Sequence, residues 1–255
     1  MSRRVFITGA SSGIGAALAR AYAADGATLG LLGRRREALQ ALADDLPGEH
    51  LVLVADVADA NSLQQAAVEF NDRFGLPDIV IANAGVSSGT LSEERSDLLA
   101  FERIVQINLL GMAATFQPFI RDMRRARHGQ LVGISSVAGV RGLPGAGAYS
   151  ASKAAASRYL ESLRVELRGS GVKVMEIRPG YIRTPMTDGN PYRMPFILDA
   201  DEAARRFLRA IDSGCARATI PWQMAIVARA LACVPCWLYD RLAIRAGRKP
   251  RGLLK

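Results

Sequence analysis

Short apolar runs alternate with longer amphipathic stretches along most of this chain. The runs are rich in Val, Ile and Leu and show no inward/outward alternation, a pattern typical of strands that are covered on both faces of a parallel sheet. We expect strands over Val5–Thr8, Thr28–Leu32, Leu51–Val54, Ile79–Ala82, Gln130–Ile134, Lys173–Ile177 and a weaker Ala218–Ile220.

The stretches between these runs carry apolar residues spaced three and four apart, as in helices with one buried face. Predicted helices are Ile14–Asp25, Arg35–Asp45, Asn61–Phe74, Leu98–Arg125, Tyr149–Gly169 and Asp201–Asp212. Such sustained alternation predicts an α/β fold: a single-domain, Rossmann-like, doubly wound parallel sheet of about seven strands with helices on both faces.

We expect residues 1–220 to form this catalytic domain, with dinucleotide and substrate sites together, and residues 221–255 to form a basic amphipathic C-terminal extension. The stretch Pro185–Leu198 contains Gly189, Pro191 and Pro195 and predicts a mobile insertion between a strand and a helix.

The composition is that of an ordinary globular protein. The 255 residues are 49% hydrophobic and 22% charged, which excludes disorder, and three Cys cannot form a disulfide framework. No charge-free apolar run approaches the roughly 18 residues of a spanning helix. A strand-like run begins at Val5, which leaves no room for a signal peptide, so we expect a cytoplasmic protein.

A glycine-rich turn follows the first predicted strand. Gly9, Gly13 and Gly15 lie between that strand and a helix, where free N–H groups and the helix dipole suit a pyrophosphate. The spacing is G-x3-G-x-G, and not the commoner G-x-G-x-x-G. It favours a phosphate-binding turn over a simple connection between strand and helix.

The end of the second predicted strand indicates which ribose the site accepts. A carboxylate there would bind the 2′-hydroxyl of NAD, whereas an arginine would pair with a 2′-phosphate. Arg34, Arg35 and Arg36 follow Gly33, and no acid occurs before Glu37. Cations are disfavoured at a helix N-terminus, so at least Arg34 is expected to have an anionic partner, and the predicted cofactor is NADP(H).

Tyr149 and Lys153 lie four residues apart in a predicted helix, so both project from one face. A phenol with a pKa of ~10 is a poor proton donor at neutral pH. A nearby ammonium would lower that pKa, and a nicotinamide cation would lower it further. The pair is therefore a candidate general acid/base, although the same spacing also occurs on ordinary helix surfaces.

Polar residues end two other predicted strands at the edge where such sheets bind ligands. Ser135 and Ser136 follow one strand, and Asn83 follows another. Asn108 interrupts the apolar run Ile104–Leu110 inside a helix. Such an asparagine satisfies a hydrogen bond in the core or holds a functional water, and the sequence leaves both open.

Together these motifs resemble the short-chain dehydrogenase/reductase family, NADP-preferring type, over about residues 4–215. The turn Thr8–Gly15 is similar to its cofactor motif, Asn83-Ala84-Gly85 to its sheet-stabilising motif, Asp56-Val57 to its adenine-contacting pair, Tyr149–Lys153 to its active-site motif and Pro179–Thr184 to its nicotinamide-side turn. The family's usual spacing before the tyrosine selects Ser136 over Ser135.

The resemblance implies a role for each matching residue. Tyr149 would be the general acid/base, and Lys153 would lower its pKa and hold the nicotinamide ribose. Ser136 would donate to the substrate oxygen. Asn108 would position a water that links Lys153 to solvent. Implied cofactor contacts are Gly9, Ser11, Ser12, Gly13, Ile14, Arg34, Asp56, Val57, Asn83, Ala84, Gly85, Tyr149, Lys153, Pro179, Gly180, Ile182 and Thr184.

Two classes of function are compatible with these residues. The first is an NADP(H)-dependent oxidoreductase that interconverts a carbonyl and a secondary alcohol on a hydrophobic small molecule, with reduction as the working direction. The apolar residues expected around the substrate are Val140, Leu143, Met186, Tyr192, Met194, Pro195 and Phe196. The second is a cofactor-sensing or membrane-docked interaction protein that keeps the fold without turnover.

Some residues do not indicate a metal or redox site. We expect His50 and His128 to be surface histidines. Cys233 and Cys236 form a lone C-x-x-C pair without further zinc ligands nearby, so we expect buried or oligomer-facing thiols and no metal.

The C-terminal extension carries most of the net charge of +9, because residues 221–255 hold seven Lys/Arg against one Asp. Its apolar stripe, which Pro235 should kink, is Val227, Leu231, Val234, Leu238 and Leu242, and its basic residues are Arg229, Arg241, Arg245, Arg248, Lys249, Arg251 and Lys255. We favour a helix that completes the substrate pocket or a homodimer or homotetramer surface. Peripheral membrane contact through residues 222–246 is the second interpretation. No nucleic acid is expected, since aromatic interleaving is absent.

Overall fold

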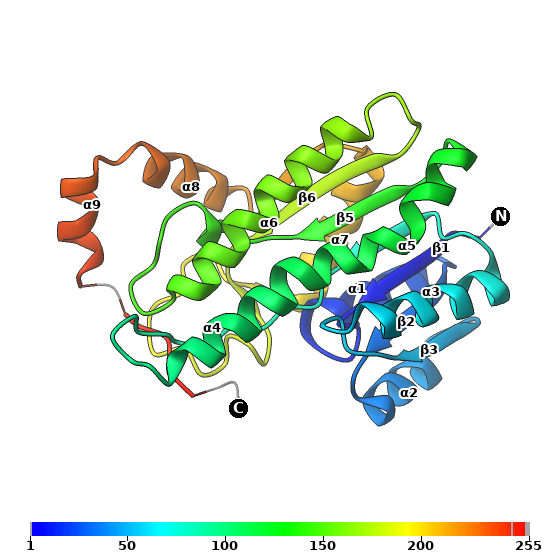
Figure 1. Cartoon of the computed structure of the whole chain (residues 1–255), viewed down its shortest axis with the longest axis horizontal. Helices are drawn as coiled ribbons and strands as arrows, with labels where there is room; N and C mark the ends of the chain where they lie inside the picture. Colours follow the sequence, from blue (N-terminus) through cyan, green and yellow to red (C-terminus); the bar gives the residue numbers. More distant parts are fainter. Residues whose placement is uncertain (1, 246, 253–255) are drawn as a thin grey trace.

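The computed structural model describes residues 2–245 and 247–252. Its main sheet has seven parallel strands in the order β3-β2-β1-β4-β5-β6-β9. The strands are β1 Arg4–Thr8, β2 Thr28–Gly33, β3 His50–Val54, β4 Ile79–Ala82, β5 Gln130–Ile134, β6 Lys173–Pro179 and β9 Arg217–Ile220. The predicted doubly wound parallel sheet is therefore confirmed (Figure 1).

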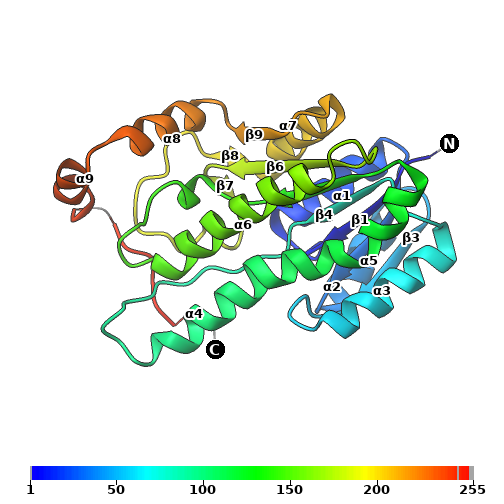
Figure 2. The same ribbon diagram turned by 45° about the horizontal axis from the view of Figure 1, so that its top comes forward.

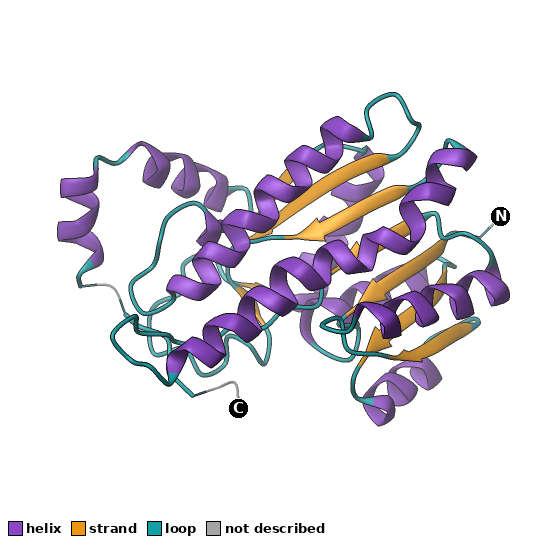
Figure 3. Ribbon diagram, viewed as in Figure 1, coloured by secondary structure: helices purple, strands orange, loops and turns teal. Residues whose placement is uncertain are grey.

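Helices cover both faces of this sheet (Figure 3). They are α1 Gly13–Ala24, α2 Arg36–Asp45, α3 Ala60–Phe74, α4 Asp97–Val105, α5 Gly111–Ala126, α6 Gly147–Glu166, α7 Ala200–Ser213, α8 Gln223–Cys233 and α9 Cys236–Ala243. Helices α1, α2 and α7 pack on one face, and α3, α5 and α6 pack on the other, as the turned view in Figure 2 shows.

The strands supply both cores because consecutive side chains point to opposite faces. In β1, Val5 and Ile7 belong to the core beneath α1, whereas Phe6 belongs to the core beneath α5. The ring of Phe6 meets Phe70 and Phe119 edge-on at 5.5 and 5.0 Å between centroids. Burial on both faces explains why the strands read as continuous apolar runs.

One predicted strand is not apolar throughout. Glu176 lies in the middle of β6, and its residue is only 3% exposed. The expectation of an apolar run over Lys173–Ile177 was wrong at this position, and the reason is a set of polar partners that the local sequence does not reveal.

The predicted helix Leu98–Arg125 is a continuous helix from Asp97 to Ala126 with a π-helical turn, η1, at Gln106–Leu110. By length and composition alone this helix could cross a membrane, although it contains charged residues and so is not one of the charge-free runs considered above. Its residues Met112, Phe116, Phe119 and Met123 are nonetheless buried in the core beneath the sheet, as in a core helix.

The insertion after β6 forms a small separate ribbon. Strand β7 (Ile182–Arg183) pairs with β8 (Leu198–Asp199), and a loop without strand or helix connects them. The last strand of the main sheet ends at Ile220. Helices α8 and α9 follow it and project from one end of the body (Figure 2). Treating them as a separate extension stays a prediction.

Candidate active site

The glycine turn brings the backbone of three segments close together. Gly9 and Gly13 have positive φ values of 68° and 56°. A Cβ on Gly9 would lie 2.8 Å from the Cα of Ala84, and a Cβ on Gly15 would collide with the Gly9 carbonyl. The turn therefore requires glycine at both positions, for conformation and for close packing.

The start of α1 is open to an anion. Ser12 precedes the helix, but its side chain makes no capping hydrogen bond, and the first turn contains no acidic residue. The N–H groups of this turn and the positive end of the helix dipole suit a phosphate group. A Cβ on Gly13 would lie 3.3 Å from Thr184, so the turn after β6 adjoins the glycine turn.

Asn83 ties the end of β4 to the glycine turn. Its Nδ2 donates to the carbonyl oxygens of Thr8 (3.0 Å) and Gly9 (3.2 Å). The Thr8 hydroxyl in turn accepts from the N–H groups of Asn83 and Ala84, both at 3.2 Å. These bonds fix the two strand ends that the resemblance assigned to cofactor contact.

The basic residues after β2 are arranged differently from the sequence expectation. Arg34 lies at the sheet edge with a 61% exposed side chain, and its nearest acid is Asp56 at 3.9 Å. Arg35 is the residue that reaches the glycine turn, where its guanidinium donates to the Ser11 carbonyl (3.1 Å) and hydroxyl (3.0 Å). The sequence analysis did not select Arg35, although its place in the Arg34–Arg36 run was a signal.

Asp56 lies at the end of β3 with Val57, as the resemblance implied. Burial alone would raise the pKa of its carboxyl, but the Ala58 N–H, the hydrogen-bonded Arg103 and the charge of Arg34 outweigh burial and lower that pKa. Asp56 is therefore ionised at neutral pH. Arg103 was also missed, because it lies on α4, far away in sequence.

The structure brings Ser136 against Tyr149 and turns Ser135 away. The Ser136 side chain lies near enough to the Tyr149 phenol to lower its pKa, and the Ser136 oxygen accepts from the Ala138 N–H at 3.1 Å. The Ser135 hydroxyl instead donates to Glu176 at 2.7 Å. Of the two serines that follow β5, Ser136 is thus the one available to a substrate beside Tyr149.

Lys153 lies behind Tyr149 on the same helix. Its Nζ is 5.9 Å from the centre of the Tyr149 ring and donates to the Ile134 carbonyl at 2.8 Å. Lys153 is 4% exposed, and burial lowers the pKa of its ammonium from 10.5 to about 8. Tyr149 and Lys153 therefore project from the same face of α6, as predicted.

The expected direction of the tyrosine pKa was wrong for the chain alone. Burial raises the pKa of Tyr149 above its usual value of 10.0, and the hydrogen bond from Ser136 only partly opposes this rise. Burial thus outweighs the effect of the neighbouring groups, and the Lys153 Nζ donates its hydrogen bond to the Ile134 carbonyl. An acidic phenol at this site needs a further positive charge.

Asn108 lies in the π-helical turn and is fully buried. Its Oδ1 accepts from the Val86 N–H (2.8 Å), and its Nδ2 donates to the Val86 carbonyl (3.0 Å) and to Ser152 Oγ (3.0 Å). The Ser152 hydroxyl donates to the Tyr149 carbonyl at 2.8 Å. These bonds give Asn108 a core role, since it fixes the loop after β4 against α6, and a water held beside it stays a prediction.

Glu176 is the buried polar centre that the sequence analysis missed. Its carboxylate accepts from Ser135, Ser157, Arg178 Nε (2.7 Å) and Arg217 Nε (2.6 Å). Burial would raise the pKa of this carboxyl, but these partners lower it to about 2. The signal in the sequence was an acid inside an otherwise apolar strand.

The turn after β6 carries the remaining predicted cofactor contacts. Pro179 ends β6, and the Gly180 N–H donates to the Ile220 carbonyl at 2.9 Å. A Cβ on Gly180 would lie 2.6 Å from Met224 of α8, so α8 packs directly on this turn. Thr184 is held by Thr187, whose hydroxyl accepts from the Thr184 N–H at 3.0 Å.

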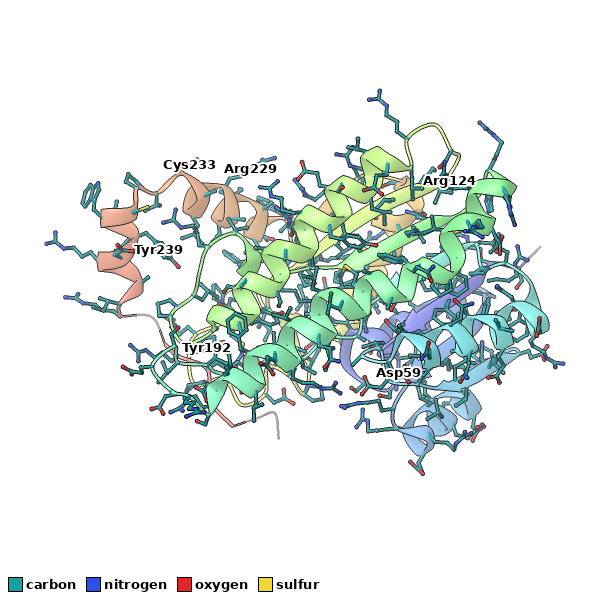
Figure 4. The ribbon with its side chains drawn as sticks, in the orientation of Figure 1. Asp59, Arg124, Tyr192, Arg229, Cys233 and Tyr239 are labelled. Atoms are coloured by element: carbon teal, nitrogen blue, oxygen red, sulfur yellow. The ribbon has the colours of Figure 1, made fainter. Side chains whose placement is uncertain are left out.

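Aromatic side chains and the chain end enclose the space beside Tyr149. The rings of Tyr181 and Tyr192 are 6.4 Å apart, and the side chain of Tyr192 packs against Gly247. Lys249 donates to the Met186 carbonyl at 3.0 Å. Residues 247–251 therefore cross over the insertion, close to where Figure 4 labels Tyr192.

A cavity of about 570 Å³ lies at the other end of the sheet. It is lined by charged residues that include Arg3, Arg4, Asp78 and Lys173. Arg4 pairs with Asp78 at 3.0 Å, and Arg3 pairs with Asp212. This cavity lies at the amino ends of the strands, whereas ligands of open α/β sheets bind at the carboxyl ends, where Ser136 and Tyr149 lie.

Across residues 2–245 and 247–252, no group of three His, Cys, Asp or Glu side chains is placed to hold a metal. Cys233 and Cys236 are free thiols, and both are exposed. Of the two expectations, burial is wrong, because the thiols lie where α8 ends and α9 begins, and an oligomer-facing position stays a prediction.

Known proteins share the sequence pattern and the architecture of this chain. Residues 3–193 match the family model described as short chain dehydrogenase. An oxidoreductase of Myxococcus xanthus is 38% identical over 246 residues, which are 95% of this chain and 97% of that protein.

Two solved structures extend the comparison. A short chain dehydrogenase from Burkholderia cenocepacia in complex with NADP has a TM-score of 0.82 and 26% identity, over 94% of this chain and 97% of that one. A 3-oxoacyl-[acyl-carrier protein] reductase from Brucella melitensis with bound NAD has a TM-score of 0.74 and 28% identity, over 86% and 89%. The chain belongs to the short-chain dehydrogenase/reductase family and is a nicotinamide-dependent oxidoreductase acting on CH–OH groups.

Proposed function

We propose that this protein is an NADP(H)-dependent oxidoreductase that interconverts a carbonyl and a secondary alcohol, with Tyr149 as general acid/base. The observation that carries the proposal is the placement of Ser136 beside the Tyr149 phenol, whose pKa it lowers, with Lys153 buried behind the Tyr149 ring. Ser136, which can donate a hydrogen bond, and Tyr149, which can donate a proton, therefore lie together beside the glycine turn.

The residues of the chain fit a dinucleotide. Its phosphates would be held by the uncapped first turn of α1 and the glycine turn, where a Cβ on Gly9 or Gly15 would collide with neighbouring backbone. Asp56 and Val57 would hold the adenine side. Asn83, Ala84 and Gly85 would line the middle, and Pro179, Gly180, Ile182 and Thr184 the nicotinamide side. When bound, the nicotinamide supplies or accepts the hydride.

The choice of NADP(H) rests on the positive charge beside the ribose. Arg34 and Arg35 lie at the end of β2, and Arg35 already contacts Ser11 in the glycine turn. A guanidinium in this position pairs with a 2′-phosphate. Cellular NADPH makes reduction the working direction.

Each catalytic residue then has a distinct task. Ser136 donates a hydrogen bond to the substrate oxygen and stabilises its developing negative charge. Tyr149 donates a proton to that oxygen in reduction, or accepts it in oxidation. Lys153 holds positive charge and a ribose hydroxyl next to Tyr149. Asn108 holds the loop after β4 against the helix that carries both residues, beside a water route to Lys153.

We infer a hydrophobic substrate from the residues around Tyr149, since Tyr181, Tyr192, Val140 and Leu143 are largely apolar. We also expect a homodimer or homotetramer in the cytoplasm. A substrate panel with NADPH tests the first expectation, and turnover of polar sugars alone would contradict it.

The decisive experiment compares Tyr149→Phe with Tyr159→Phe, a partly buried tyrosine of the same helix. Tyr149→Phe should lower kcat roughly 10²- to 10⁴-fold and leave NADPH binding intact. Tyr159→Phe should retain turnover. Equal turnover in both variants would refute catalysis by Tyr149, whereas NADPH binding without turnover in the parent chain and in both variants would favour a cofactor-sensing protein.

A further inference from the structure

Helices α8 and α9 extend beyond the body of the protein and have little to pack against (Figures 1 and 2). Helix α9 has no buried residue. Its described contacts with the body include the stacking of Arg141 on Tyr239 at 4.2 Å and a hydrogen bond from the Tyr239 hydroxyl to the Gly142 carbonyl. One side of each helix therefore faces solvent in the single chain.

The solvent side of α8 is apolar. Met224 and Ala228 are buried against the body, and the predicted stripe residues Val227 and Leu231 are partly buried. The opposite face carries Trp222 (63% exposed), Ile226 (57% exposed), Arg229 and Cys233, at spacings of four, three and four. Figure 4 labels Arg229 and Cys233 along this helix. The solvent-facing side of a helix normally carries polar side chains, so an exposed tryptophan on α8 is unusual.

Helix α9 repeats this composition. Trp237 is 67% exposed, and Arg241 and Ile244 follow on the same face at spacings of four and three. Residues 222–244 hold five of the fourteen exposed large apolar side chains of the described chain, and the chain has only two tryptophans, Trp222 and Trp237. This segment is therefore rich in exposed apolar side chains, as is the start of α4 with Leu98, Leu99 and Phe101, but only this segment carries tryptophan.

Positive charge surrounds these apolar side chains. Arg229, Arg241, Arg245 and Arg248 form no ion pair among the described residues, and Asp240 is the one acid in residues 221–255. The remaining described cations of the segment are engaged elsewhere: Arg251 pairs with Asp97, and Lys249 donates to the Met186 carbonyl. Lys255 and Ala246 lie outside the described residues.

These features favour an anionic membrane over a second copy of the chain. Two such surfaces would bring like charges together, whereas anionic headgroups attract arginine and the bilayer interface accommodates tryptophan. Helices of 11 and 8 residues are also too short to span a bilayer, which needs ~20, but long enough to lie on its surface.

We propose that the exposed faces of α8 and α9 dock peripherally on an anionic phospholipid bilayer. Trp222, Ile226, Trp237 and Ile244 insert among the headgroups, and Arg229, Arg241 and Arg245 bind the phosphates. The sequence favours contact with the substrate pocket for this extension, and one face of α8 does pack on that side, where Met224, Val227 and Ala228 meet Val140 and Tyr181. The proposed docking face is the opposite one, which carries the exposed Trp222 and Ile226.

The experiment uses the full chain and its own tryptophans. Vesicles made of equal parts phosphatidylglycerol and phosphatidylcholine are added at low salt, with pure phosphatidylcholine vesicles alongside. We expect a blue shift of tryptophan emission, quenching by bromine-labelled acyl chains and co-sedimentation with the anionic vesicles only, all reversed by high salt. Because both tryptophans lie on the proposed surface, the emission reports on it alone.

Matched variants separate charge from apolar contact. The triple variant Arg229→Gln, Arg241→Gln, Arg245→Gln keeps both tryptophans and should weaken vesicle binding on the order of a hundredfold. The triple variant Arg20→Gln, Arg121→Gln, Arg124→Gln removes the same charge from exposed sites on the body and should bind nearly as the parent does. Trp222→Ser with Trp237→Ser should abolish co-sedimentation, whereas Val68→Ser with Leu99→Ser should not.

Two results would overturn the proposal. One is unchanged emission and no co-sedimentation with anionic vesicles. The other is emission that is already blue-shifted without vesicles, together with sedimentation that converts from dimer to monomer on Trp222→Ser and Trp237→Ser, which would identify a second copy as the occupant.

Discussion

Ser135 donates a hydrogen bond of 2.7 Å to the buried carboxylate of Glu176. The same carboxylate accepts from Ser157 of α6 and from Arg217 of β9. Ser157 lies one turn after Lys153, and its hydroxyl also contacts the Lys153 carbonyl at 3.0 Å. Glu176 therefore joins the strand end that carries Ser136 to the helix that carries Tyr149 and Lys153.

Glu176→Gln should destabilise the fold at neutral pH. The carboxyl has its pKa lowered from 4.5 to about 2, which corresponds to about 3 kcal/mol of the free energy of unfolding. Since the folded pKa lies below the unfolded one, this stabilisation is present above pH 4.5 and is lost as the pH falls towards 2. Urea denaturation at pH 7 and at pH 3 measures the loss and its decrease to about half.

The matched control is Asp199→Asn, which removes a carboxylate that is 73% exposed and paired with Arg183. Exposed pairs contribute only about 0–1 kcal/mol. Equal destabilisation by the two variants at pH 7 would show that Glu176 is no stronger an anchor than a surface acid.

Lys153→Met should stabilise the fold and abolish turnover. Burial lowers the pKa of the ammonium from 10.5 to about 8, so below pH 8 the folded protein carries the full cost of a buried charge. That cost disappears as the pH rises to 10.5. Allowing for the lost hydrogen bond to Ile134, we expect the free energy of unfolding at pH 7 to rise by about 2 kcal/mol. Lys173→Met, at an exposed lysine of β6, is the control and should change stability little.

A decrease in stability for Lys153→Met would show that the ammonium is better solvated or paired than its position behind Tyr149 indicates. Retained turnover in the same variant would separately contradict the proposed role of Lys153. The two readouts are independent, because urea denaturation needs no cofactor.

The sequence predicted the sheet well because its signal is local. Strands buried on both faces must be apolar, and Val5–Thr8 or Gln130–Ile134 show this within five residues. The glycine turn and the Tyr149–Lys153 pair were found for the same reason, since conformation and helix spacing restrict nearby residues.

Features that depend on distant segments were missed. Glu176 needs Ser135, Arg178 and Arg217, and only the folded sheet brings the first and last of these to β6. The raised pKa of Tyr149 follows from burial, which pairwise spacing to Lys153 does not reveal. Likewise, spacing located an apolar stripe in α8 but could not show which face of that helix meets the body.

Arg34→Ala and Arg35→Ala should each weaken NADPH binding and leave NADH binding nearly unchanged. A charge-assisted hydrogen bond to phosphate contributes roughly 1.5–3 kcal/mol, so we expect a loss of about tenfold or more in NADPH affinity. Arg36→Ala, at the exposed first residue of α2, is the control. Titration of cofactor fluorescence measures each affinity, and an unchanged NADPH/NADH ratio in both variants would contradict the NADP(H) assignment.

Arg251→Ala should release the chain end from the substrate side of the site. The Arg251 guanidinium donates to Asp97 at 2.7 and 3.2 Å, and the Pro250 carbonyl accepts from the Gly89 N–H at 2.8 Å. These bonds hold residues 247–251 across the insertion, where Gly247 packs on Tyr192. Without the ion pair we expect trypsin to cleave after Arg248 at least several-fold faster and KM for a hydrophobic substrate to rise, because the apolar enclosure opens.

The control Arg245→Ala removes an exposed arginine with no ion pair among the described residues and should change neither readout. Faster cleavage with an unchanged KM would mean that the chain end is latched by Arg251 but does not shape the substrate site.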